Sequence, residues 1–130
     1  MSRSPRPSSA PPARDDLLLL ALRACADPVR LTILRLLARD AFGVQELGAV
    51  LDLGQATVSH HLKQLVEAEL VTARRDGTHV FYRRALPRPE RPGAATLAAL
   101  LAELDAQALA PAQRSALDAV FEERARRSRA

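Results

Sequence analysis

The sequence VTARRDGTHVFYRR, at residues 71–84, constrains the fold more than any other segment. Two β-prone runs flank Asp76-Gly77, a preferred pair for a two-residue type I′ turn, so the segment predicts a β-hairpin. The expected register pairs these residues: Arg75 with Thr78, Ala73 with Val80, and Val71 with Tyr82. Their apolar members then share the core face: Val71, Ala73, Val80 and Tyr82. The opposite face carries three polar side chains: Arg74, His79 and Arg83.

Two helical segments open the folded part of the chain. From Asp15, the sequence DDLLLLALRACA has acids at its start and places Leu18, Leu22 and Cys25 on one face. Asp27-Pro28 is typical of a helix start, because Asp caps and Pro suits the first helical position. We expect this second helix to end near Asp40.

Two more helical segments separate that helix from the hairpin. VQELGAVL begins after Gly43, and Glu46 stands at the position of a capping-box acid. Phe42 and Leu47 match a hydrophobic staple. The sequence DLGQ predicts a tight turn, and a fourth helix is expected from Gln55 to Ala68. Its buried face should be formed by Val58, Leu62 and Leu65.

A Pro-rich connection follows the hairpin, and two helical segments are expected after it, at about 96–109 and 112–127, separated at Pro111. Their apolar stripes consist of Leu97, Leu101, Leu104 and Ala108 and of Leu117, Val120 and Phe121. The predicted organisation is a disordered tail (1–14), a winged helix-turn-helix domain (15–86), a linker (87–94) and a helical dimerisation segment (95–128). The expected fold is therefore mainly helical with one small hairpin.

The outward face of the fourth helix carries the residues expected to contact a partner. If its apolar stripe faces inward, the exposed side chains are Gln55, Ala56, Ser59, His60 and Lys63. Gln is able to bond adenine bidentately, Ser and His bond base edges or phosphates, and Lys neutralises phosphate. The hairpin adds Arg74 and Arg75 beside the turn and Arg83 and Arg84 at its far end. With a formal net charge of +4, the pattern favours double-stranded DNA as the partner.

Other function classes fit the sequence less well. We find no Gly-rich phosphate loop and no nucleophile elbow, so we do not expect an enzyme. An aromatic content of 3% offers no stacking platform for single-stranded nucleic acid. A winged-helix module that binds protein remains an alternative, but its exposed helix face would be acidic or apolar. An ordinary solvated helix face is the remaining alternative.

The segments ADPVRLTILRLL, VQELGAVLDLGQ and TVSHHLKQLVEAELVTARRDGTHVFYRR resemble the ArsR/SmtB family of bacterial repressors over roughly Leu17 to Arg84. The resemblance implies a winged-helix homodimer that binds an operator of imperfect dyad symmetry, with its first and last helices in the dimer interface. It places the family's DNA contacts on these residues: Gln55, Thr57, Ser59, His60, and the wing from Arg74 and Arg75 through Gly77 to Thr78. Gly54 departs from the pattern, because many members have a capping Ser there.

The metal-sensing residues of that family are missing from this sequence. The third helical segment lacks the family's cysteine pair, and the last two segments contain neither His nor Cys. We therefore expect no metal and no other cofactor. A redox role for Cys25, the one cysteine, is an alternative, although it fits better as a small buried residue. An organic or redox-active effector, or control by abundance alone, would then regulate the protein.

The expected location is the bacterial cytoplasm, with the protein bound to the nucleoid through DNA. One cysteine per chain gives no disulfide framework. The longest apolar run, Leu17 to Leu22, is too short to span a bilayer, and the basic first residues lack the apolar core of a signal peptide. No membrane partner is expected.

Overall fold

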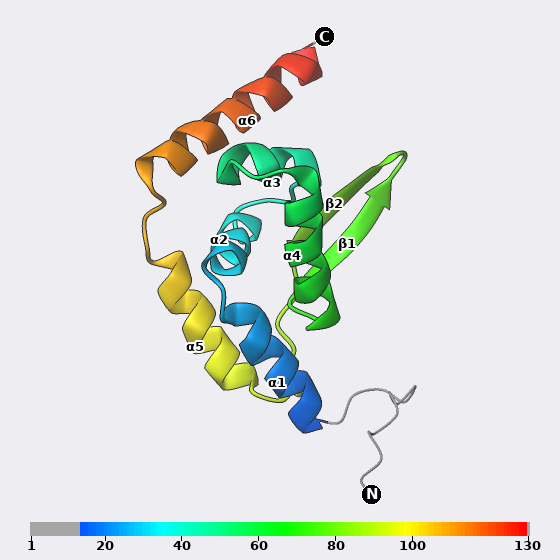
Figure 1. Cartoon of the computed structure of the whole chain (residues 1–130), viewed down its shortest axis with the longest axis vertical. Helices are drawn as coiled ribbons and strands as arrows, with labels where there is room; N and C mark the ends of the chain where they lie inside the picture. The colour runs from blue at the N-terminus through cyan, green and yellow to red at the C-terminus, as the bar shows by residue number, and fades with distance from the viewer. Residues whose placement is uncertain (1–13, 130) are drawn as a thin grey trace, which may run out of the picture.

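The computed structural model describes residues 14–129. The predicted disordered tail, apart from Arg14, lies outside the described residues. These form six helices and one two-stranded antiparallel hairpin (Figure 1). In chain order the elements are α1 (Arg14–Cys25), α2 (Pro28–Leu37), α3 (Val44–Leu51), α4 (Gln55–Glu67), β1 (Val71–Asp76), β2 (His79–Arg84), α5 (Ala94–Asp105) and α6 (Pro111–Arg129). The order agrees with the expected fold class.

Helix α2 begins where the Asp27-Pro28 pair predicts. The Asp27 carboxylate accepts hydrogen bonds from the backbone N–H groups of Val29 (2.8 Å) and Arg30 (3.1 Å). The helix ends at Leu37, earlier than the expected end near Asp40. Asp40 instead accepts a hydrogen bond from the backbone N–H of Ala41 at 2.7 Å. Such local side-chain bonding favours a turn over continued helix.

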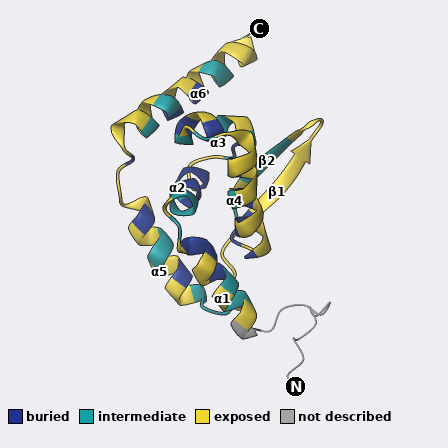
Figure 2. Cartoon of the chain, viewed as in Figure 1, coloured by how far each residue is buried: buried dark blue, intermediate teal, exposed yellow. Residues whose placement is uncertain are grey.

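The core lies inside the group formed by α1 to α4 and strand β1, and α5 and α6 add residues from outside (Figure 2). Its largest fully buried side chains are Phe42, Ile33, Leu34, Leu36, Leu47, Leu62, Leu65, Val58 and Val71. Phe42 and Leu47, the predicted staple, both have 0% exposure. The two C-terminal helices diverge, since α5 packs against α2 and α6 packs against α3. The core therefore joins helices far apart in sequence.

The predicted hairpin is present, but its register was wrong. The observed pairs are Ala73 with Tyr82, Arg75 with Val80 and Asp76 with His79, so the loop is Gly77-Thr78. Only Gly77 of this loop has a positive φ (63°), as in a type II′ turn. A type I′ turn over Asp76-Gly77 would also require Asp76 in the left-handed region, but Asp76 is instead the last residue of β1. The shift is two residues, so each side chain keeps its predicted face.

Several apolar residues differ from their predicted burial. On α1 the buried positions are Ala21, Ala24 and Cys25, whereas Leu22 is 45% exposed. Ala73 is exposed at the projecting part of the hairpin, where no core lies beneath it. Ala108 is also exposed, because α5 ends at Asp105 rather than near Leu109. Periodicity identified the helices, but it did not identify which apolar positions another element covers.

Candidate nucleic-acid interface

Helix α4 presents a polar face to solvent. Its buried face consists of Val58, Leu62 and Leu65, as the sequence predicts. Six of the candidate DNA-binding residues are exposed on this helix: Gln55, Ala56, Thr57, Ser59, His60 and Lys63. Their roles in binding stay predictions, but their exposure leaves all six side chains accessible to a partner.

The adjacent histidines on α4 have different environments. His60 is exposed, whereas His61 is half-buried and its Nδ1 lies 3.3 Å from an Nη of Arg30. The Arg30 guanidinium also donates to the backbone oxygens of Ala24 (2.7 Å) and Arg23 (3.2 Å). His61 therefore faces the junction between α1 and α2, and only His60 is available to a partner on the open face.

A close backbone approach fixes the turn between α3 and α4. A Cβ built on Gly48 would lie 2.8 Å from the backbone oxygen of Leu53, too close for a real side chain. The backbone N–H of Leu53 donates to the Gly48 oxygen at 3.1 Å, and Asp52 has a left-handed φ of 56°. Gly54 then caps α4 without a side-chain hydrogen bond. These contacts set the angle between α3 and α4.

Gly48→Ala should lower the free energy of unfolding by about 1–3 kcal/mol, because the added methyl group forces α3 away from the Leu53 backbone. Gly54→Ser is the matched control on the same turn. It has no atom within 4 Å of its would-be Cβ, and a Ser cap should stabilise α4 by a few tenths of a kcal/mol. Urea unfolding of both variants measures the difference. A Gly48→Ala protein as stable as wild type would contradict this account of the turn.

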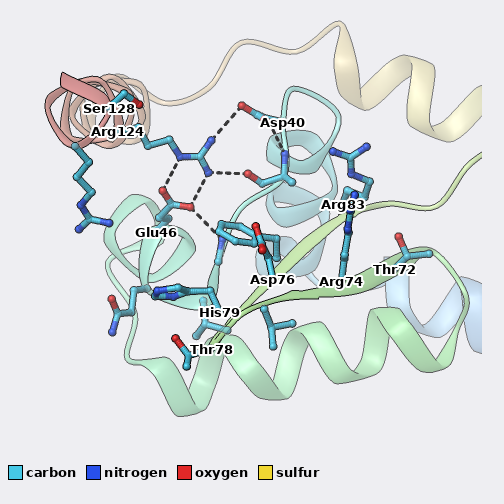
Figure 3. Close-up of a pocket in the computed structure, with 17 residues that line it drawn as sticks. Asp40, Glu46, Thr72, Arg74, Asp76, Thr78, His79, Arg83, Arg124 and Ser128 are labelled. Carbon is cyan, nitrogen blue, oxygen red and sulfur yellow. Dashed lines mark hydrogen bonds and ion pairs between the residues drawn. The ribbon is translucent and has the colours of Figure 1, made fainter. Parts of the chain in front are cut away.

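The two arginines beside the wing turn point to opposite faces of the hairpin. Arg75 is paired with Val80 and shares its face with Tyr82, which packs on the core. Arg74 lies on the other face, and Figure 3 shows it pointing away from α4, beside Arg83. Gly77 and Thr78 form the exposed tip. Arg74 and Arg75 therefore point to opposite faces of the hairpin, and Thr78 of the tip lines the same groove as Arg74.

Arg84 has a structural position that hairpin periodicity did not reveal. Its guanidinium donates to the backbone oxygen of Leu34 in α2 (2.5 and 3.2 Å) and to the Asp105 carboxylate (2.8 and 2.9 Å). The Arg84 side chain is 15% exposed. Its hydrogen bonds lower the pKa of Asp105, against a smaller opposing effect of burial. Arg84 thus anchors the base of the wing to α2 and α5. The expectation of an exposed arginine here, free to contact a partner, was wrong.

Arg124 joins α6 to the start of α3, a contact that the sequence did not predict. It donates to both carboxylate oxygens of Glu46 at 2.7 Å, to the backbone oxygen of Ala41 at 2.7 Å and to Asp40 at 3.1 Å (Figure 3). Its guanidinium carbon also lies 4.9 Å from the centre of the Phe42 ring. Phe42 forms an isolated β-bridge with Tyr82 of the wing. Arg124 therefore supports the wing through Phe42.

Cys25 lies in the core with 9% exposure. Burial raises the pKa of its thiol, and the guanidinium groups of Arg30 and Arg91 oppose this rise. A raised pKa keeps the thiol protonated at neutral pH, and the thiolate is the reactive form. The environment of Cys25 thus resembles that of a packing residue.

Comparisons with known proteins agree with this geometry. Residues 27–73 match the sequence profile described as "Bacterial regulatory protein, arsR family". The chain is 40% identical over 72 residues to a biofilm growth-associated repressor of Agrobacterium fabrum, covering 55% of this chain and 62% of that protein. It is 44% identical over 78 residues to the transcriptional repressor SmtB of Mycobacterium tuberculosis, covering 58% of each. The matches thus span about three fifths of these relatives.

A solved structure extends the comparison to the fold. The homodimeric winged helix-turn-helix DNA-binding domain of a possible ArsR-family regulator from Mycobacterium bovis is 32% identical, with a TM-score of 0.57. The match covers 73% of this chain and 83% of that one. Both the sequence of residues 27–73 and the arrangement of helices and wing are thus shared with proteins of one family. The chain belongs to the ArsR family of bacterial transcriptional regulators, which are DNA-binding proteins and not enzymes.

Proposed function

We propose that this protein is a dimeric transcriptional repressor that binds an imperfect inverted repeat in double-stranded DNA. The observation that carries the proposal is the exposed face of α4, which has polar or small side chains and no acid from Gln55 to Lys63. A helix with this face fits a major groove, where Gln55, Ser59 and His60 would read base edges. The repressor names of the curated relatives support the same function.

The wing would supply contacts that do not depend on sequence. Arg75 lies on the face of the hairpin that carries Val80 and Tyr82, and Gly77 and Thr78 form the tip. We assign the phosphate contact to Arg75, with the two tip residues approaching the backbone beside it. Phosphate contacts position a protein on DNA, whereas base contacts select the sequence.

Alanine substitution of α4 and wing residues tests this division. Gln55→Ala, Ser59→Ala and His60→Ala should each weaken operator binding by roughly 1–3 kcal/mol. Arg75→Ala should instead weaken binding to all sequences and reduce the slope of the salt dependence by about one. Fluorescence anisotropy with operator and scrambled duplexes, over a range of salt, separates the two effects. Recognition-helix variants that bind the operator as tightly as wild type would refute the placement of α4.

The dimer would use the apolar surface of α1. Leu19 and Leu22 are 46% and 45% exposed, and their spacing of three places them on one side of the helix. Leu101 of α5 is only partly buried by its own protomer. A second copy of the chain, related by twofold symmetry, would cover these side chains and hold two α4 helices about one DNA turn apart. Helix α6, which packs on α3, is left out of this interface.

We also propose that the regulator does not sense metal through the family's usual sites. Among residues 14–129, the structure brings no three His, Cys, Asp or Glu side chains into a metal-binding group. His61 is held near Arg30, and His79 lies on the wing, so the histidines do not converge. Tight zinc binding requires about four converging ligands.

Operator affinity should therefore be unchanged by Zn(II), Cd(II), As(III) or EDTA. The measurement is an anisotropy titration of operator DNA with each addition, repeated with Cys25→Ser. A large loss of affinity with one metal ion, abolished by Cys25→Ser, would show that the dimer builds a thiolate site. In that case Cys25 would be the sensor.

A further inference from the structure

A groove lies between the outer face of the wing, the start of α3 and the end of α6 (Figure 3). Its volume is about 860 Å³, within the size range of small-molecule sites. The residues that matter here come from the wing (Thr72, Arg74, Phe81, Arg83), α3 (Gln45) and α6 (Arg127). The groove is on the side of the hairpin away from the exposed face of α4, although Thr78 of the wing tip lines its edge.

Two arginines in this groove, Arg74 and Arg83, have no ion-pair partner among residues 14–129. Thr72 is paired with Arg83 and Arg74 with Phe81, so the two arginines occupy diagonal positions on one face of the hairpin. Figure 3 shows both side chains extending from the hairpin on the side away from α4. Neither forms an ion pair with any residue of the described chain, 14–129. Like charges on neighbouring strands repel each other, and an anion bound between the two guanidinium groups would remove that repulsion.

The acids of the groove do not neutralise these arginines. Glu46 and Asp40 are both bound by Arg124. Asp76 lies beyond Arg74, toward the wing tip, and it makes no ion pair within the described residues. The groove therefore has an excess of positive charge around Arg74 and Arg83. The half-buried ring of Phe81, which lies next to His79, adds an apolar surface beside them.

We propose that this groove binds a small organic anion through a carboxylate or phosphate group. Arg74 and Arg83 would donate to the anionic oxygens, as guanidinium groups commonly do, and the Thr72 hydroxyl would add a neutral donor. Phe81 would contact the apolar body of the molecule. The site does not depend on the DNA-binding proposal, because its residues lie on the opposite face of the hairpin from Arg75.

Calorimetric titration of the whole 130-residue chain without DNA tests the site. The probes are inorganic pyrophosphate and citrate, which distinguish a phosphate from a carboxylate preference. Wild type should bind at least one of them, one molecule per protomer, and Arg83→Gln should bind it roughly tenfold more weakly. Arg114→Gln is the matched control, since it removes an exposed arginine of α6 outside the groove. Equal affinity in Arg83→Gln and wild type, or no binding of either probe, would overturn the proposal.

An operator titration without either probe distinguishes a small anion from the DNA backbone as the occupant. Arg83→Gln should bind operator DNA as Arg114→Gln does. If it loses affinity for every duplex and its salt slope falls by about one, the groove holds a DNA phosphate, and the small-anion proposal is wrong. Failure of wild type to bind any duplex would contradict the proposed function and leave the calorimetric result standing.

Discussion

Leu22→Glu should produce a monomer that no longer retains the operator at concentrations that saturate wild type. The Leu22 side chain is 45% exposed in the protomer, so the substitution leaves the core intact. In the proposed dimer it would place a carboxylate in each copy of a symmetric apolar interface, and burying an unpaired charge is costly. Loss of the second α4 helix should then reduce operator affinity by about 100-fold or more, because the two half-sites no longer bind together.

Sedimentation velocity and anisotropy on one protein preparation measure both effects. Leu86→Glu is the matched control: it makes the same change at a leucine that is 84% exposed and follows the hairpin. That variant should remain a dimer with wild-type affinity. A dimeric Leu22→Glu protein that binds normally would show that the interface lies elsewhere. Circular dichroism confirms that each variant keeps its helices.

Arg124→Met should lower the free energy of unfolding by about 2–4 kcal/mol. The side chain is 30% exposed and satisfies Glu46, Asp40 and the Ala41 oxygen together. Methionine keeps the apolar contact with Phe42 but leaves the Glu46 carboxylate, 22% exposed, without its cation. Removing one partner of a partly desolvated ion pair costs more than the net value of the pair, because the remaining carboxylate keeps its desolvation cost without a cation. Arg126→Met is the control, since the Arg126–Glu123 pair on the same helix is exposed.

The same pair gives the stability a dependence on pH. Burial alone would raise the pKa of Glu46, but hydrogen bonds from Arg124 and from the Gly43 N–H lower it below its usual 4.5. A carboxyl group with a lowered pKa in the folded state stabilises the protein above pH 4.5, and this stabilisation is lost as pH falls below that value. Urea unfolding at pH 7 and at pH 3.5 should show a smaller acid-induced loss in Arg124→Met than in wild type. An equal loss in both would mean that Glu46 does not depend on Arg124.

Local sequence signals account for the elements but not for the contacts that position the wing. Asp27-Pro28 and the stripe of Val58, Leu62 and Leu65 act within one helical turn or two, and both predictions agree with the structure. The hairpin register was missed because Gly77 is able to supply the positive φ of either two-residue turn. The sequence Asp76-Gly77-Thr78 is compatible both with a type I′ turn over the first pair and with a type II′ turn over the second.

The two structural arginines could not be found from local patterns at all. Arg84 reaches Leu34, 50 residues away, and Arg124 reaches Glu46, 78 residues away. In the sequence both are arginines among many others, and nothing in their spacing distinguishes them from arginines without an ion pair within the described residues, such as Arg83. Only the packing of α5 and α6 against the domain shows which guanidinium groups are committed to structural contacts. The exposed face of α4 was predictable, because one helix determines it.

Lys63 is the only lysine of the chain, and it is exposed on the polar face of α4. Amine-directed chemistry therefore has a single side-chain target, located in the middle of the proposed DNA interface. An activated ester would attach a fluorophore or a cross-linker there without any prior mutagenesis. Enzymatic acetylation of lysine, which removes the positive charge, would likewise alter this surface and no other side chain. Among the side chains, such reagents therefore modify α4 alone, and the α-amino group is the other amine that they reach.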